Sequence, residues 1–214
     1  LVIGSGAAGL GLALSLADRY SVAVVCKDDL LSSSSQYAQG GIAAVMASGD
    51  SHASHIADTL NAGAGLCDPA VVDYTVRHAK QAIEWLVRQG VEFTMADQHY
   101  HLTQEGGHSQ KRILHSADKT GAAVVKTLSQ QVLDHPNIYS LTQYTALELI
   151  LREQHCYGAY FLENQTQKIT AISANITVLA TGGASMVYQH TTNANHTSGD
   201  GIVLAAKAGA NIAN

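Results

Sequence analysis

The chain opens with Leu1-Val2-Ile3-Gly4-Ser5-Gly6-Ala7-Ala8-Gly9, the stretch that decides the fold. A short apolar run meets three glycines in the spacing G-x-G-x-x-G, and apolar residues at helical spacing continue to Ala17. This order predicts a strand, a glycine turn and a helix. The valine-rich segment Ser21 to Cys26 follows and completes a βαβ unit with two parallel strands. The sequence therefore predicts an α/β fold with a ligand crevice at the carboxyl ends of its strands.

The glycine turn has a defined chemical use. It lets the backbone approach a pyrophosphate, while the helix N-terminus offers free amides and a partial positive charge. Between a strand and an amphipathic helix, the motif favours dinucleotide binding over an ordinary turn, without separating FAD from NAD. The acidic residue expected after the second strand is displaced by Lys27. Either Asp28 reaches the ribose or Lys27 reaches the nucleotide directly, whereas Asp29 is equally well explained as a solvated turn residue.

A polar segment of small residues extends from Leu31 to Gly41. Its four serines alone are typical of a linker. A glycine pair and the apolar run Ile42 to Met46 follow directly, however, which favours a buried loop that faces a ligand. The segment from Asp50 to Leu60 then has a helical pattern.

Two further helices are predicted. Asp68-Pro69 begins one that ends at Gly90, because Asp caps free amides and Pro at the first position loses no hydrogen bond. Its expected apolar face comprises Val71, Val72, Thr75, Ala79, Ala82, Ile83, Leu86 and Val87. The other runs from about Asp118 to Asp134 and ends at His135-Pro136.

Strands dominate the last part of the chain. Tyr139 to Ala180 alternates and predicts several antiparallel strands, with breaks at Glu153 to His155 and at Asn164 to Thr166. The last strand runs into Thr181-Gly182-Gly183, a second point where a two-part ligand can approach the backbone, although such a glycine pair is commonly only a turn. Thr197 to Ala210 predicts a loop and a helix, with Asp200 as a plain N-cap.

Composition excludes several classes of protein. The 214 residues carry 14% charged side chains and a net charge of −5, with no basic run for a nucleic acid. The longest apolar stretch has eleven residues, too few for a membrane span. Cys26, Cys67 and Cys156 match neither a disulfide framework nor a zinc spacing, which favours reducing cytosol. The chain has no initial Met and ends abruptly, so we expect an internal piece of a longer protein.

Eleven histidines raise the question of a metal site. His99-x-His101 and His52-x-x-His55 lack the cysteine or carboxylate partners that zinc and iron sites use, so we expect no metal. Such histidines are expected at the surface or behind a site. Gly106-Gly107-His108 differs, because two glycines let polar groups sit close to a planar ligand.

Several longer motifs occur together. They are GSGAAG at residues 4–9, YAQGGIAAV at 37–45, DTLNAGAGLCD at 58–68, TQEGGHSQKRILHSADKTG at 103–121, LATGGAS at 179–185 and SGDGI at 198–202. As a set they resemble the L-aspartate oxidases, flavoenzymes related to the flavoprotein subunits of succinate dehydrogenase and fumarate reductase. The resemblance covers essentially the whole chain.

The resemblance implies a doubly wound, Rossmann-like FAD-binding domain with an antiparallel β-meander. Residues 1–214 correspond to its first segment, and a capping domain and a helical C-terminal domain are expected beyond residue 214. Ser5 to Ala8 would hold the pyrophosphate, Lys27 would meet the adenosine side and Asp200 would contact FAD. Along the flavin would lie Ser34, Ser35, Gln36, Tyr37, Ala38, Gln39, Gly40 and Gly41. Covalently flavinylated relatives carry a histidine where this chain has Ser34, so noncovalent FAD is implied.

In this resemblance, Glu105 distinguishes the L-aspartate oxidases from the related succinate and fumarate enzymes. It stands where the succinate and fumarate enzymes carry an aromatic residue, and aspartate differs from succinate by an α-ammonium that needs a buried anion.

The resemblance implies oxidation of L-aspartate to iminoaspartate on the route to NAD, with oxygen or fumarate as acceptor and quinolinate synthase as pathway partner. The substrate-binding arginines and histidines would lie in the capping domain, leaving this piece inactive alone. The alternatives are a soluble fumarate reductase or succinate dehydrogenase flavoprotein and a non-catalytic FAD-binding module.

Overall fold

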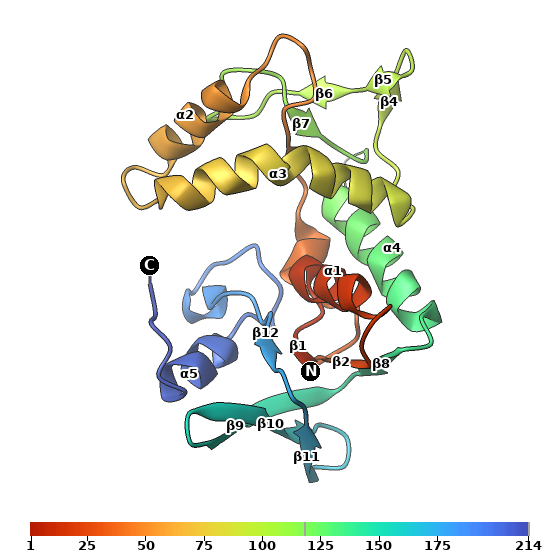
Figure 1. Ribbon diagram of the computed structural model, residues 1–214, viewed down its shortest axis with the longest axis vertical. Coiled ribbons are helices and arrows are strands. Elements are labelled where there is room, and N and C mark those ends of the chain that lie inside the picture. Colours follow the sequence, from red (N-terminus) through yellow and green to blue (C-terminus); the bar gives the residue numbers. More distant parts are fainter. Residues whose placement is uncertain (118, 214) are drawn as a thin grey trace. The chain divides into compact units, whose positions relative to one another are not determined.

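A computed structural model describes residues 1–117 and 119–213, which form two compact units. Unit 1 contains Leu1–Tyr37 and Val125–Ala213, and unit 2 contains Ala38–Val124. Helix α4 (Thr120–Asp134) carries the chain from unit 2 into unit 1 (Figure 1). It ends where the sequence predicts, whereas its expected first residue, Asp118, lies outside the described residues.

Unit 1 is built on a parallel sheet of order β12-β1-β2-β8. The strands are β1 (Val2–Ile3), β2 (Val22–Val25), β8 (Ile138–Leu141) and β12 (Val178–Leu179). Helix α1 (Ala7–Leu16) joins β1 to β2 and confirms the predicted βαβ unit. Because β1 has β2 on one side and β12 on the other, the strand order reverses at β1, where such folds bind ligands.

The backbone of the first turn leaves no room for a side chain at Gly4 or Gly9. Gly4 has φ +116°, and a Cβ there would lie 2.2 Å from the carbonyl oxygen of Ala180. A Cβ at Gly9 would lie 2.0 Å from the carbonyl oxygen of Gly4. The spacing G-x-G-x-x-G therefore lets β1, α1 and the end of β12 pack closely together.

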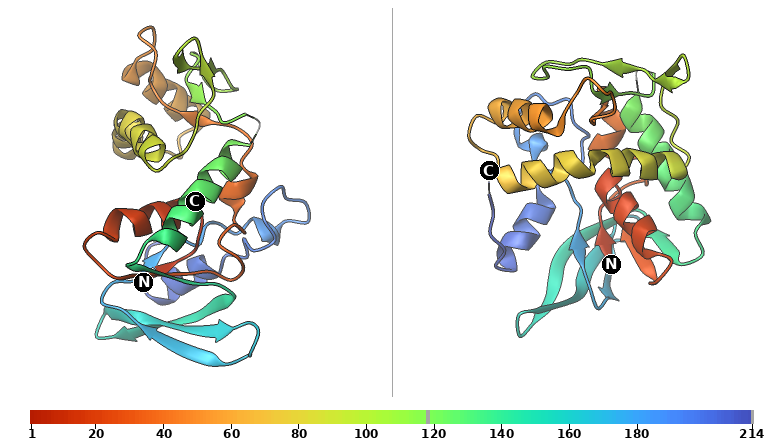
Figure 2. Two further views of the ribbon diagram at one scale, coloured as in Figure 1. Left: turned by 90° about the vertical axis from the view of Figure 1, so that its right-hand side faces the viewer. Right: turned by 45° about the horizontal axis from the view of Figure 1, so that its top comes forward.

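A second sheet in unit 1 is an antiparallel meander of order β11-β10-β9. Its strands are β9 (Tyr144–Arg152), β10 (His155–Glu163) and β11 (Ile169–Ser173). Ile3 and Val25 of the parallel sheet pack with Ala159 and Phe161 of the meander, which Figure 2 shows as a separate layer. The three strands and their two breaks confirm the sequence-based prediction.

The prediction of antiparallel strands was wrong at both ends of the stretch from Tyr139 to Ala180. Residues 178–179 belong to β12, which pairs in parallel with β1, and residues 139–141 belong to β8, which pairs in parallel with β2 in the register Val22↔Ile138. Strand β8 follows a helix rather than a hairpin turn, and a helical crossover returns the chain in the same direction. Unit 1 is completed by η1 (Ser34–Tyr37), η2 (Ser185–Val187) and α5 (Asp200–Lys207).

Besides the first turn of α4, the described part of unit 2 contains helices and short strands. The helices are α2 (His52–Ala62) and α3 (Pro69–Arg88). The strands are β3 (Ile42–Ala43), β6 (Leu102–Thr103) and β7 (Ile113–Leu114), in the order β3-β7-β6, and the pair β4 (Met95–Ala96) and β5 (His99–Tyr100). Among the described residues, no helix is long and apolar enough to cross a membrane.

Helix α3 begins as predicted, since the Asp68 carboxylate accepts hydrogen bonds from the amides of Ala70 and Val71. Its predicted apolar face was partly wrong. The buried residues are Val72, Val76 and Ile83, whereas Val71 is 59% exposed. Val71 lies about 100° around the helix from Val72, outside the buried stripe. Val87 is exposed in the last turn.

The segment from Leu31 to Gly41 was predicted to be a buried loop, and this was wrong for most of it. Leu31 and residues 37–40 are exposed, and residues 32–36 are half-buried. The physical reason is that Ser32 to Ser35 form one wall of an open cavity instead of packing into the core.

Candidate functional site

A cavity of about 320 Å³ opens at the carboxyl ends of β1, β2 and β12 in unit 1. It is lined by the first glycine turn, the end of β2, the serine segment and the start of α5. Predicted site residues among its lining are Gly4, Ser5, Gly6, Ala7, Ala8, Lys27, Ser34, Ser35, Thr181, Gly182 and Asp200. Segments far apart in sequence therefore meet at the predicted edge of the sheet.

The N-terminus of α1 points its first turn at this cavity. Gly6 is the N-cap residue and has no side chain to cap the amides of the first turn. The amide of Ala7 donates to Ser35 Oγ at 3.1 Å, which ties the serine segment to the helix. Free amides and the helix dipole make this terminus suited to an anion. Gly9, in contrast, is buried and does not line the cavity.

Two serine hydroxyls of the cavity wall are unusual. Ser33 Oγ and Ser34 Oγ are buried and have no hydrogen-bond partner among the described residues. A buried polar atom without a partner is destabilising, so such atoms commonly mark a place where a ligand or water binds. Ser34 was among the predicted site residues and Ser33 was not, although both belong to the same run of four serines.

Lys27 anchors the rim of the cavity near α5. Its Nζ lies 2.6 Å from Ser198 Oγ and 2.7 Å from Asp200 Oδ2. Partial burial raises the pKa of Asp200, but hydrogen bonds from Lys27 and Ser198 outweigh it and leave the pKa below its ordinary value. Asp200 was predicted to be an N-cap, and this was wrong. Gly199 occupies that position, and the Asp200 carboxylate turns to the lysine instead.

Asp28, rather than Asp29, lines the cavity. It accepts a hydrogen bond from Gln143 Nε2 at 2.8 Å, and His196 Nε2 lies 3.0 Å from its other oxygen. The Gln143 hydrogen bond is the main reason that the Asp28 pKa is lowered. Gln143 and His196 were not predicted, because nothing local in the sequence indicates that they approach Asp28.

The turn after β12 packs on helix α5. A Cβ at Gly201 would lie 1.7 Å from Thr181 Oγ1, so the two segments touch. Gly182 has φ +74°, and a Cβ there would meet nothing within 4 Å. The predicted turn is present with Gly182 beside open space, and its contact with a ligand stays a prediction.

The remaining predicted residues do not line the cavity. Gln36 and Tyr37 lie in η1 of unit 1, with Tyr37 59% exposed. Unit 2 contains Ala38, Gln39, Gly40, Gly41 and Glu105. Within unit 2, a Cβ at Gly40 would lie 3.1 Å from Glu105 Oε1. The structure thus brings the Glu105 carboxylate against Gly40, whereas Gly41 packs against Leu114.

Glu105 was expected to be a buried anion, and within this chain it is exposed. The reason is local, since Glu105 lies in a turn that leaves β6 and returns at β7, with exposed glycines beside it. The carboxylate is therefore open on one side and lies against the Gly40 backbone on the other.

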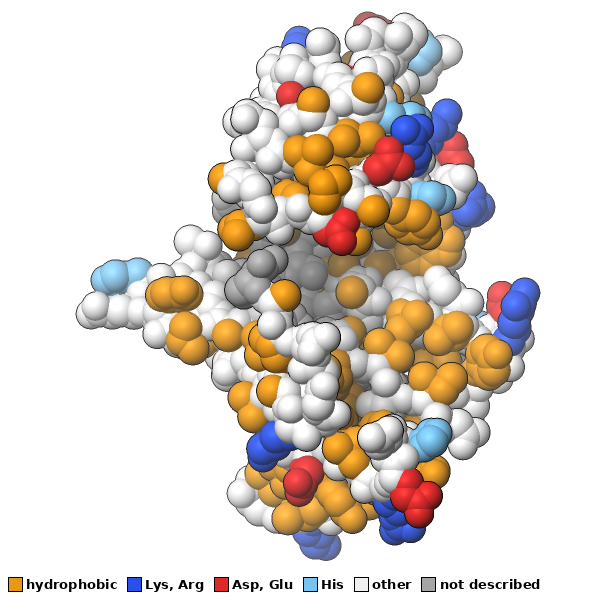
Figure 3. Space-filling view, turned by 60° about the vertical axis from the view of Figure 1, so that its left-hand side comes forward, with side chains coloured by type: hydrophobic (Ala, Val, Ile, Leu, Met, Phe, Trp, Pro, Cys, Tyr) orange, Lys and Arg blue, Asp and Glu red, His pale blue; other side chains and the backbone are white. Residues whose placement is uncertain are grey.

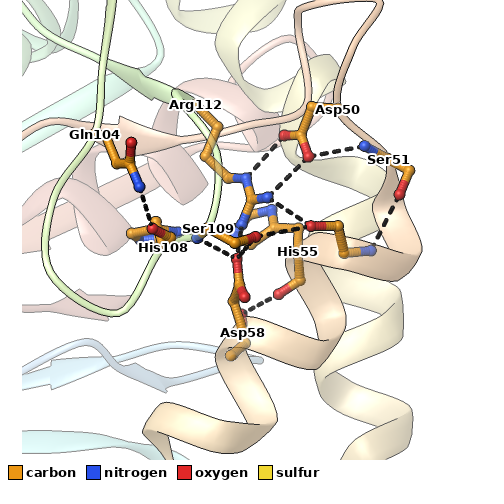
Figure 4. A network of polar contacts seen from close by, with 10 residues as sticks. Asp50, Ser51, His55, Asp58, Gln104, His108, Ser109 and Arg112 are labelled. Atoms are coloured by element: carbon orange, nitrogen blue, oxygen red, sulfur yellow. Dashed lines mark hydrogen bonds and ion pairs between the residues drawn. The ribbon is translucent and has the colours of Figure 1, made fainter.

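A buried ion-pair network in unit 2 was not predicted. Arg112 is fully buried, and its guanidinium donates two hydrogen bonds of 2.8 Å to the Asp50 carboxylate. Its Nη1 lies 2.6 Å from Asp58 Oδ2, and Ser54 and Ser109 complete the network (Figure 4). Asp58 and Arg112 both fall within the motifs quoted above, which is the signal that could have drawn attention to them.

The histidines have local partners. His101 Nδ1 and His115 Nε2 lie 2.8 Å apart at the surface of unit 2. His55 is 6% exposed and faces Arg112 and His108, so of its two expected positions, at the surface or behind a site, the surface position is excluded. Among residues 1–117 and 119–213, no three His, Cys, Asp or Glu side chains gather in a way that could hold a metal ion.

The charged side chains do not form a continuous field on the face drawn in Figure 3. Lys and Arg side chains are scattered there, several of them beside Asp or Glu side chains.

Comparison with known proteins gives the family. A model of the FAD binding domain matches residues 1–214. An L-aspartate oxidase of Pseudomonas aeruginosa is 47% identical over 100% of this chain and 42% of its own length. One from a Synechocystis species is 48% identical over 99% of this chain and 38% of its own. The chain thus spans about two fifths of the length of these curated relatives.

Solved structures agree on the fold. A quinol fumarate reductase chain of E. coli matches with a TM-score of 0.92 and 32% identity, covering 96% of this chain and 36% of that one. A Mycobacterium smegmatis Sdh1 chain gives a TM-score of 0.92 at 28% identity, covering 97% of this chain and 37% of that one. The chain belongs to the FAD binding domain family of flavoproteins, and within it resembles the L-aspartate oxidases over its whole length.

Proposed function

We propose that this chain binds FAD noncovalently in unit 1 and that the full-length protein oxidises L-aspartate to iminoaspartate. The observation that carries the substrate is the open carboxylate of Glu105 against the Gly40 backbone. The family and the identity to L-aspartate oxidases support the cofactor and the reaction class. The product would enter NAD biosynthesis, where quinolinate synthase is the expected partner.

The cavity of unit 1 suits a dinucleotide. The uncapped N-terminus of α1 suits a pyrophosphate, with Ser5 to Ala8 around it. The orphan hydroxyls of Ser33 and Ser34 offer hydrogen bonds to a polar ligand. We assign Lys27 and Asp200 to the adenosine side, Thr181 and Gly182 to the second close approach, and Ser34 to Gly41 to the flavin.

Glu105 performs the recognition in this proposal. Its carboxylate pairs with the α-ammonium of aspartate, orients Cα and accepts a proton from nitrogen. When bound, FAD supplies the acceptor for the hydride that leaves Cα. Aspartate thereby loses one hydride and one proton and becomes iminoaspartate. The electrons then pass to oxygen, which gives hydrogen peroxide, or to fumarate, which gives succinate.

Other parts of the full-length protein complete the site. We propose that the remaining length of the relatives includes a capping domain, with the residues that bind both substrate carboxylates.

The three cysteines are unpaired, which supports a reducing compartment such as the cytosol.

A second candidate is a fumarate reductase or succinate dehydrogenase flavoprotein. The TM-score of 0.92 with the E. coli quinol fumarate reductase favours it. Glu105 argues against it, because a carboxylate beside an uncharged methylene of succinate gains no ion pair. Anaerobic addition of L-aspartate or succinate to the full-length flavoprotein separates the two candidates, and a non-catalytic FAD-binding module would respond to neither.

Noncovalent binding of FAD is directly testable. Acid precipitation of the purified full-length protein should release all of the yellow colour into the supernatant, because Ser34 provides no nitrogen nucleophile for a flavin bond. Absorption spectra of pellet and supernatant measure the result. Colour that stays in the washed pellet would contradict noncovalent binding.

A further inference from the structure

The loop that carries Glu105 has a closed base and a compact tip. At the base, the Arg112 amide donates to the Thr103 carbonyl oxygen at 3.1 Å. At the tip, Gln104 Nε2 donates to the His108 carbonyl at 2.7 Å, and the His108 amide donates to the Glu105 carbonyl at 3.2 Å. The backbone of Glu105 is therefore part of a hydrogen-bonded turn.

Helix α2 holds this loop through one carboxylate oxygen. Asp58 Oδ2 accepts hydrogen bonds from the Ser109 amide and the Ser109 hydroxyl, both at 2.8 Å, and from Arg112 Nη1 at 2.6 Å. Figure 4 shows the Asp58 side chain reaching from the helix to Ser109 and Arg112. Ser54 Oγ, one turn earlier on α2, lies 3.0 Å from Ser109 Oγ. Two of the three bonds to Asp58 Oδ2 come from Ser109 and fix it against α2.

The charges of this contact are stable at neutral pH. Hydrogen bonds from the Ser109 amide and hydroxyl, and then from Arg112, lower the pKa of Asp58 from 3.8 to about 2. Arg112 is itself held by Asp50, whose side chain is 2% exposed. The carboxylate thus presents a fixed negative charge to the loop.

The two glycines between the anchor and Glu105 have no side chains that could hold the loop in one direction. A Cβ at Gly106 would meet nothing within 4 Å, and Gly107 has φ +84°. Glycine leaves the backbone many conformations, so the direction of this segment depends on what holds its two ends. Ser109 is the end that α2 holds.

From these contacts we propose that Asp58 is a positioning residue, which holds Ser109 and thereby keeps the Glu105 carboxylate against Gly40 for the substrate ammonium. The inference deepens the proposed function and rests on it. Asp58 contacts neither Glu105 nor Gly40 in the structure, so its action passes through the loop backbone.

A double-mutant cycle in the full-length holoenzyme tests this role. Asp58→Asn removes the charge and should lower kcat/KM for L-aspartate oxidation by about 3- to 10-fold, the effect of roughly one hydrogen bond. Fumarate reduction should change less than about twofold, since fumarate has no ammonium. In a Glu105→Gln background, Asp58→Asn should cause almost no further loss, because the group that it positions is already inactive.

The matched control is Asp73→Asn on α3. It disrupts an exposed aspartate–arginine pair, Asp73 with Arg77, whose hydrogen bonds lie within α3. Hydrogen exchange followed by mass spectrometry gives a readout besides activity. The peptide containing the His108 and Ser109 amides should exchange faster in Asp58→Asn than in the wild type. In Asp73→Asn, its exchange rate should equal that of the wild type. Unchanged exchange in Asp58→Asn would overturn the inference.

The outcomes are distinguishable. Equal losses for both substrates, or the same loss with and without Glu105, would overturn positioning and leave Asp58 a support of the fold alone. If Glu105→Gln lowers aspartate oxidation much more than fumarate reduction while Asp58→Asn changes neither, the inference is overturned and the proposed function stands. If Glu105→Gln lowers both activities equally, both are overturned. If Asp58→Asn does not fold, Ser109→Ala, which lacks only the hydroxyl, enters the same cycle with the same criteria.

Discussion

Oxidation of L-aspartate should fall by about 10- to 150-fold when Glu105 is replaced by glutamine in the full-length protein. A hydrogen bond to a charged group contributes roughly 1.5 to 3 kcal/mol, and each 1.4 kcal/mol corresponds to about tenfold in rate. Glutamine keeps the size and shape of the side chain but presents no charge to the α-ammonium. Steady-state kinetics with L-aspartate measures the loss of kcat/KM.

Fumarate provides the internal control for this variant. Because fumarate has no ammonium, its reduction should change much less than aspartate oxidation. Glu84→Gln is the matched control variant, since it removes one exposed glutamate charge on α3, outside the loop. Equal losses on the two substrates would contradict the ammonium-pairing role, and little effect on either would identify Glu105 as an ordinary loop carboxylate.

The largest expected effect on stability comes from Arg112→Met. This change leaves the Asp50 carboxylate, with 2% exposure, without its cation. Removal of one partner from a buried ion pair destabilises by about 3 to 5 kcal/mol. Urea titration followed by circular dichroism measures the free energy of unfolding. Arg77→Met, which breaks the exposed pair with Asp73, should have little effect.

The stability lost in Arg112→Met should depend on pH in a defined direction. Asp50 and Asp58 have lowered pKa values in the folded chain, with Asp58 at about 2 against an ordinary 3.8. Their stabilisation is therefore present above about pH 4 and is lost as the pH falls toward 2. The difference between wild type and Arg112→Met should shrink over that range. A difference that stays constant from pH 7 to 2 would contradict the ion-pair account.

Local signals explain how much of the fold could be predicted. The βαβ unit and the start of α3 depend on residues close in sequence, such as Gly4 to Gly9 and Asp68-Pro69. The parallel pairing of β8 with β2 depends on which strand lies beside it, a choice made between residues more than 100 positions apart. Alternation alone does not distinguish parallel from antiparallel neighbours.

The candidate site also has a part that could be predicted from local sequence and a part that could not. The glycine turn could be read directly because its chemistry is local. Lys27 was named from its position after the second strand, as an alternative to Asp28, whereas Asp200 was named as a cofactor contact only through the family resemblance. The network of Asp50, Asp58 and Arg112 went unpredicted, because charged residues far apart in sequence carry no sign that they will meet in a core. Even the exposure of Glu105 depends on which neighbouring parts of the chain cover its loop.

Anaerobic addition of L-aspartate to the full-length protein with its FAD tests the central claim most directly. The flavin absorbance should bleach with L-aspartate, whose α-ammonium Glu105 recognises, and much less with succinate, which lacks that group. Readmission of oxygen should restore the colour and form hydrogen peroxide. Flavin that stays oxidised in excess L-aspartate, or that succinate bleaches equally well, would contradict the assignment.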